Sequence, residues 1–121
     1  MPTVERFEPR DLGPKDWGKE LLIGHAEGLY TLKRLTYRAG AKGPLQYHER
    51  KDETFYLHSG SARVTWTDYD GWLQSALMEP GESYHIPPEA VHQFEALTDC
   101  VVFEASNPVF DDRVNEEDQY R

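Results

Sequence analysis

The sequence has 121 residues, of which 38% are hydrophobic and 29% are charged, which indicates one folded globular domain and excludes a disordered chain. The formal net charge of −9 argues against nucleic acid or an anionic membrane surface as a partner. No apolar run reaches the roughly 20 residues that span a bilayer. The single cysteine, Cys100, excludes an internal disulfide, and Met1 to Arg10 lacks the apolar centre of a signal peptide, so we expect a cytoplasmic protein.

Residues 1–20 are rich in chain breakers, with three prolines and two glycines. This density favours an extended arm over a helix, and we expect the arm to pack on a partner subunit.

From Leu21 onward, short apolar or alternating runs are separated by turn residues such as Ser59-Gly60 and Pro87-Pro88. Runs of this length and spacing are typical of a β-sandwich or barrel. The threonines and tyrosines of the run at residues 29–38 favour a strand over a helix. The predicted strands are residues 20–23, 29–38, 54–57, 61–67, 72–77, 83–86, 92–97 and 100–105.

The alternation of residues along these strands predicts which side chains face the core. In residues 61–67 the even-numbered positions are apolar and should point inward. By the same rule Glu53 points to the side on which Phe55 and Leu57 lie. The last segment, residues 111–121, is acidic and is expected to be a solvated tail.

One constellation of polar residues predicts a metal site. The sequence reads Gly40-x5-Gln46-x-His48-x4-Glu53-x6-Gly60 and later Gly81-x5-Pro87-x4-His92. Gln46 and His48 are two residues apart on an extended chain, so their side chains share a face. Glu53 and His92 each follow a turn, so two hairpins can bring all four groups to one point. Two imidazoles, one carboxylate and one amide oxygen suit a first-row divalent metal.

Three alternatives stay open at this level. A second register, His48-x-Arg50, would break the spacing to Glu53, and we prefer the Gln46 register. Gln46 can act as a hydrogen-bonding neighbour of the metal instead of a ligand, and the whole site can be structural and metal-free. We expect Cys100 to be a buried, inert thiol, and the remaining histidines to lie at the surface: His25, His58 and His85.

This spacing resembles the two sequence motifs of the cupins, with Gln46 in place of a histidine, Glu89 in place of a glycine and Ala96 in place of an asparagine. The resemblance implies an all-β fold, a single double-stranded β-helix or jelly-roll barrel. We place the barrel at residues 21–110, between the N-terminal arm, residues 1–20, and the acidic tail, residues 111–121. Because cupins dimerise through barrel edges and N-terminal arms, we expect a homodimer.

The set Gln46, His48, Glu53 and His92 is also similar to the zinc ligands of phosphomannose isomerases, which are cupins. A wider similarity connects the chain to the cupin domains of mannose-6-phosphate isomerase/guanylyltransferases, and it rests on residues 17–20, 32–35, 45–48 and 111–120. It implies a small-molecule carbohydrate substrate and one divalent metal ion, with zinc favoured and iron, manganese or nickel as alternatives.

The resemblance to sugar isomerases implies that the metal acts as a Lewis acid on a carbonyl group while a general base moves a proton between adjacent carbons. The candidates for catalytic roles are Lys33, Tyr37, Arg50 and Glu104. Glu104 can face either the interior, where burial would raise its pKa, or solvent. Two other functions stay open: a cupin dioxygenase with a redox-active metal, and a non-enzymatic module that binds a carbohydrate.

Overall fold

The structure is a computed structural model that describes residues 1–109 and 112–115, and in these residues it contains strands and turns but no helix. No segment of the described residues therefore forms a helix able to cross a bilayer. The strands are β1 (Arg10–Lys15), β2 (Gly18–Ala26), β3 (Tyr30–Tyr37), β4 (Gln46–His48), β5 (Glu53–Ser59), β6 (Ala62–Thr67), β7 (Leu73–Met78), β8 (Ser83–Ile86), β9 (His92–Ala96), β10 (Cys100–Ser106) and β11 (Arg113–Asn115).

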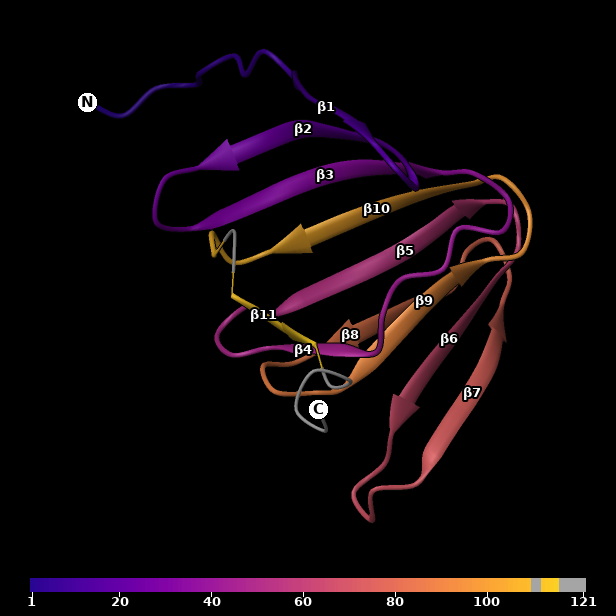
Figure 1. The fold of residues 1–121 in the computed structure, drawn as a ribbon. Coiled ribbons are helices and arrows are strands. Elements are labelled where there is room, and N and C mark those ends of the chain that lie inside the picture. The colour runs from indigo at the N-terminus through magenta and orange to yellow at the C-terminus, as the bar shows by residue number, and fades with distance from the viewer. Residues whose placement is uncertain (110–111, 116–121) are drawn as a thin grey trace.

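The strands form two antiparallel sheets, as the jelly-roll prediction requires (Figure 1). One sheet has the order β1-β2-β3-β10-β5-β8 and the other the order β11-β4-β9-β6-β7. In the first sheet Glu104 of β10 is paired with Lys33 of β3 and with Phe55 of β5. Residues paired in this way point to the same face, so these side chains lie together on the inner face.

The apolar core lies between the two sheets and confirms the predicted faces. Phe55 and Leu57 are buried on β5, and Ala62 and Val64 are buried on β6, where the intervening residues are more exposed. Ala96, which stands where the motif has asparagine, is fully buried in this core. The core residues are Leu35, Phe55, Leu57, Ala62, Val64, Met78, Ile86, Ala96, Cys100 and Val102.

Three strands occur where the sequence does not predict them. β1 lies within the expected arm and pairs with β2 with a register shift between Asp11 and Pro14. Because β1 is an edge strand, Pro14 has no ladder bond to lose on its free side. β4 is only three residues long, and β11 lies in the expected tail. Residues 112–115 are therefore packed against the domain, which corrects the expectation of a solvated end for this part; residues 110–111 and 116–121 lie outside the described residues.

Two turns depend on an unusual backbone conformation. Gly60 joins β5 to β6 with a φ of 91°, and a Cβ atom there would lie 2.2 Å from the carbonyl oxygen of Asp99. Glu89 has a φ of 70°, in the left-handed region that favours glycine. Its amide donates a hydrogen bond to the His48 carbonyl at 2.7 Å, which ties the turn before β9 to β4. The left-handed φ explains why the motif has glycine at this position.

Candidate metal centre

The proposed ligands come from both sheets and meet at one end of the sandwich. Gln46 of β4 is paired with His92, the first residue of β9, and Glu53 is the first residue of β5 in the facing sheet. The structure brings His48, Glu53 and His92 together, because one ligand atom from each can be chosen so that all three lie within 4.8 Å of one another. All three side chains are buried.

The two imidazoles are held in the form that binds metals. The Nδ1–H group of His92 donates to the Ala90 carbonyl oxygen at 2.9 Å, and Nδ1 of His48 lies 3.2 Å from Oδ1 of Asp112. Each neutral ring therefore keeps its free lone pair on Nε2, the atom that can bind a metal ion. Burial, and then the positive charge of Lys51, lower the pKa of His48; burial first, with a smaller effect of Lys51, also lowers the pKa of His92. Neutral imidazoles are the metal-binding form.

Two buried oxygen atoms at the same place accept no hydrogen bond. These are Oε1 of Gln46 and Oε2 of Glu53. Lys51 Nζ lies 3.0 Å from Glu53 Oε2, but this contact is an ion pair without hydrogen-bond geometry. Glu53 Oε2 already has the Lys51 ammonium group beside it, so Gln46 Oε1 is the acceptor that lacks a partner. Unsatisfied buried acceptors are rare in folded proteins, and a metal ion would satisfy this one. The donor set therefore fits a divalent metal ion, and the site is a possible histidine and glutamate metal centre.

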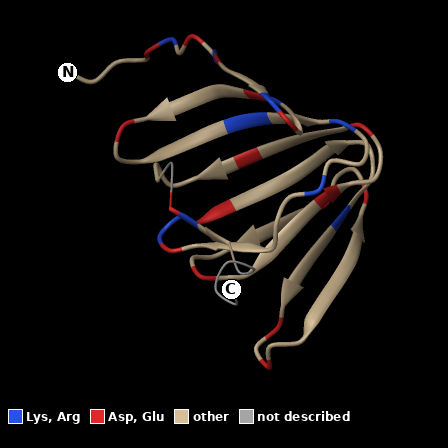
Figure 2. Ribbon diagram, in the orientation of Figure 1, with Lys and Arg blue, Asp and Glu red and all other residues tan. Residues whose placement is uncertain are grey.

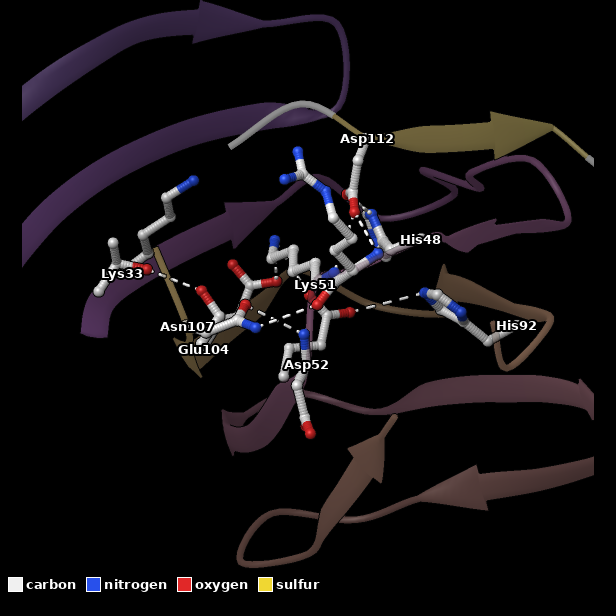
Figure 3. Close-up of polar contacts among 12 residues, drawn as sticks. Lys33, His48, Lys51, Asp52, His92, Glu104, Asn107 and Asp112 are labelled. Carbon is white, nitrogen blue, oxygen red and sulfur yellow. Dashed lines mark hydrogen bonds and ion pairs between the residues drawn. The ribbon is translucent and has the colours of Figure 1, made fainter. Parts of the chain in front are cut away.

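Lys51 and Glu104 form a buried ion pair beside these residues (Figure 3). Lys51 Nζ donates to Glu104 Oε1 at 3.1 Å. Burial opposes the charge of Lys51, but the carboxylates of Glu104 and Glu53 outweigh it and raise the pKa of the lysine. Burial first, and then the nearby Glu53 carboxylate, raise the pKa of Glu104 to about 7. Glu104 thus faces the interior, which is the first of its two predicted orientations, and not solvent.

The site opens into a cavity of about 810 Å³ between the sheets. Lys33, Tyr37 and Glu104 of the predicted catalytic candidates line this cavity, together with Gln46, His48, Glu53 and His92. Arg50 is exposed and does not occur among the described residues that line it. Figure 2 shows charged residues within β3 and β10 and at the start of β5, three neighbouring strands of one sheet.

Side chains on either side of the ligands shape the cavity. Lys33 Nζ donates to Glu20 Oε1 at 2.7 Å. Burial above all raises the pKa of Tyr37, and the Trp17 ring stacks on it with a centroid distance of 4.6 Å. Trp66 lines a second cavity of about 570 Å³ that also contacts His92.

Sequence reasoning did not find three residues of this site. Lys51 lies in the turn between two ligands and has no motif of its own, although a lysine two residues before a buried glutamate is a weak signal. Trp17 directly precedes β2 in a segment rich in chain breakers, and no motif there marks it as a site residue. Asp112 is in an acidic run, where composition gives no reason to prefer one carboxylate. Burial of its side chain opposes ionisation, but hydrogen bonds from the Arg50 and Lys51 amides and from His48 lower its pKa.

Comparison with known sequences identifies the family. A family model described as the cupin domain matches residues 33–105, which is more than half of the chain. Mannose-1-phosphate guanylyltransferase RfbM of Salmonella typhimurium strain LT2 is 31% identical over 81 residues, which are 67% of this chain and 16% of that protein. The chain thus spans less than a fifth of the length of this curated relative.

Solved structures share the fold at low sequence identity. The capsular polysaccharide assembling protein CapF of Staphylococcus aureus has a TM-score of 0.78 at 18% identity, over 91% of this chain and 33% of that chain. Oxalate decarboxylase of Bacillus subtilis has a TM-score of 0.77 at 19% identity, over 99% and 34%. KdgF of Halomonas sp. has a TM-score of 0.71 at 21% identity, over 88% and 92%. The family match and the two-sheet fold together show that this chain belongs to the cupin family.

Proposed function

We propose that the protein binds one divalent metal ion through Gln46, His48, Glu53 and His92 and uses it to isomerise or epimerise a sugar or sugar phosphate. One observation carries the proposal: these four side chains face the same cavity as Glu104, a buried carboxyl group outside the ligand set. Proton transfer next to a carbonyl group requires an electrophile and an acid–base group on one substrate.

Zinc is the metal that we propose, because two imidazole nitrogens and two oxygen donors form a set that zinc accepts. When bound, the ion would supply a Lewis acid that polarises the carbonyl oxygen of the sugar. The buried Oε1 atom of Gln46, which accepts no hydrogen bond, supports a cation at this position. Burial lowers the pKa of both His48 and His92, which supports it further, since protonated imidazoles would repel a cation.

Glu104 is the proposed general base. It would take the proton from the carbon next to the carbonyl group and return it to the former carbonyl carbon, while the hydroxyl proton passes to the former carbonyl oxygen, so that no proton is lost or gained overall. Lys51 holds this carboxyl group in place through the contact at 3.1 Å and offsets its charge. Lys33, held by Glu20 on the same side of the cavity, is proposed to contact substrate hydroxyl or phosphate oxygens. We assign no step to Arg50, because it is exposed and outside the cavity.

The cavity supports a carbohydrate ligand in size, charge and shape. Its volume of about 810 Å³ lies within the range of about 300–1,000 Å³ that is usual for small-molecule sites. Its lining includes five Lys or Arg and four Asp or Glu residues, whereas the whole chain has 13 and 22. The cavity is therefore much less negative than the rest of the protein and admits a phosphate. The stacked rings of Trp17 and Tyr37 offer an apolar surface for a sugar ring. The names of RfbM and CapF refer to sugar chemistry, which agrees with this assignment.

The test is proton exchange during turnover. Zinc-loaded protein is incubated in D2O with aldoses, ketoses and their phosphates, and NMR follows the hydrogen on the carbon next to the carbonyl group. We expect product formation with deuterium incorporation, and a loss of about 100-fold or more in the Glu104→Gln variant. The matched control is Glu95→Gln, which removes an ion pair with Arg63. Neither residue lines the cavity or belongs to the proposed ligands, so this variant should keep full activity.

The failures of this test separate the other two functions. Tight carbohydrate binding without exchange or product would contradict the isomerase and indicate a binding module. Oxygen consumption by protein loaded with iron or manganese would indicate a dioxygenase.

A further inference from the structure

The C-terminal segment contributes directly to the strand that carries two of the proposed ligands. β11 pairs with β4 at three positions, including Arg113 with His48 and Asn115 with Gln46. Among the described residues, β4 pairs with β9 at a single position, Gln46 with His92. Most of the registered pairing of β4 therefore comes from residues 113–115.

Asp112 precedes β11 and has a side chain that is only 4% exposed. Its Oδ1 atom lies 3.2 Å from Nδ1 of His48. Its Oδ2 atom accepts hydrogen bonds from the backbone amides of Arg50 at 2.5 Å and Lys51 at 2.9 Å. Figure 3 shows the Asp112 side chain pointing at His48. One carboxylate thus connects a proposed ligand to the turn that carries Lys51.

The chemistry of these contacts fixes the tautomer of His48. An ionised carboxylate only accepts hydrogen bonds, so Nδ1 of His48 must carry the hydrogen and Nε2 keeps the lone pair. His92 is fixed in the same way by the carbonyl oxygen of Ala90. His92 Nε2 is 3.6 Å from Glu53 Oε1, and one ligand atom from each of His48, Glu53 and His92 lies within 4.8 Å of the other two. Partners of this kind orient the histidines of metal sites and increase their basicity.

We propose that Asp112 is a positioning residue of the metal centre, which selects the Nδ1–H tautomer of His48 and aims its Nε2 atom at the ion. This inference rests on the metal centre proposed above.

The substitution Asp112→Asn separates this role from anchoring of the turn. The asparagine keeps one oxygen, which can still accept the bonds from the Arg50 and Lys51 amides. Its NH2 group then lies next to Nδ1 of His48 and donates to it, which forces the Nε2–H tautomer and removes the lone pair from the metal side. A residue that only anchored the turn would tolerate this change. The matched control is Asp52→Asn, because Asp52 forms a carboxylate–histidine pair with His85 at 2.7 Å at an exposed position.

Two measurements on the full chain test the proposal. Zinc affinity is measured by competition with a chromophoric chelator, and the ¹⁵N chemical shifts of the imidazoles report the tautomers of the metal-free protein. For Asp112→Asn we expect an affinity about 10- to 100-fold lower than wild type and a His48 signal changed from Nδ1–H to Nε2–H, while Asp52→Asn changes neither the affinity nor the His48 signal. Unchanged affinity and tautomer in a folded Asp112→Asn protein would overturn the inference. A wild-type protein that binds no zinc would instead overturn the proposed function. The His48 tautomer in wild type and in Asp112→Asn would then decide whether Asp112 selects the Nδ1–H form.

Discussion

The two ends of the sandwich use the same strands for opposite purposes. At the end where β5 and β9 finish, Leu57 and Ala96 are 0% exposed and pack with Met78, also 0% exposed. At the end where these strands begin, Glu53 and His92 are also buried, each 6% exposed, but polar. The apolar core and the polar site thus lie at opposite ends of the same strands. Burial of the apolar end must stabilise the fold enough to offset the free-energy cost of burying charged groups at the other end.

The charged groups at the polar end are nevertheless paired. Lys51 lies between the carboxylates of Glu53 and Glu104, at 3.0 and 3.1 Å, so no charge of this triad is buried without a partner of opposite sign. Such pairs are costly to break, although they add little net stability. The four predictions that follow compare the two ends, beginning with the largest expected effect.

Met78→Ala tests the apolar end. Because the side chain is fully buried, we expect a loss of about 2–5 kcal/mol in the free energy of unfolding, measured by urea denaturation. Its neighbour Leu77 is 58% exposed, and Leu77→Ala should change the stability by less than about 0.5 kcal/mol. Zinc affinity should stay at the wild-type value in both variants. Equal losses in the two variants would show that this end is not the core.

Lys51→Met tests the polar end. In the presence of a chelator the substitution leaves Glu53 and Glu104 as two buried carboxylates without a counter-charge, and we expect a loss of about 3 kcal/mol. Added zinc should recover part of this loss, because the ion replaces the ammonium group beside Glu53. Urea denaturation with and without zinc measures the loss of stability and its recovery. The control is Lys42→Met, at an exposed position. A loss that zinc does not reduce would contradict a cation site at Glu53.

Gly60→Ala tests the turn that closes the apolar end. The left-handed φ and the approach to the Asp99 carbonyl oxygen together should cost about 2 kcal/mol or more. Gly71 has a φ of 85° but open space around it, so Gly71→Ala should cost only about 1 kcal/mol. The difference between the two thermal midpoints isolates the steric contact, and no difference would exclude it.

Glu89→Gly tests the turn at the polar end and should stabilise the protein. Glycine relieves the left-handed strain at a φ of 70°, and we expect a gain of about 1 kcal/mol. Chemical denaturation measures the gain. Ala90→Gly in the same turn has no such strain to relieve and should destabilise; a loss in Glu89→Gly of the same size would contradict the argument.

The sequence predicts the strands of the apolar end better than it predicts the surroundings of the site, where β4, which carries Gln46 and His48, is not predicted as a strand. Alternation places Phe55 and Leu57 inward because the period of a strand is fixed by its backbone. The same rule cannot find Asp112, because its role depends on the pairing of β11 with β4 across more than 60 residues. Lys51 is missed for a related reason, since only the contact between β5 and β10 brings Glu104 within its reach.

The most direct test of a metal centre at the polar end is elemental analysis of protein purified without added metal or chelating resin. We predict about one zinc per chain in the wild type, no bound metal in the His48→Ala/His92→Ala double variant, and wild-type zinc in the control His58→Ala/His85→Ala, whose histidines are exposed. Absence of metal from the wild type, or equal zinc in the wild type and the His48→Ala/His92→Ala variant, would contradict the account.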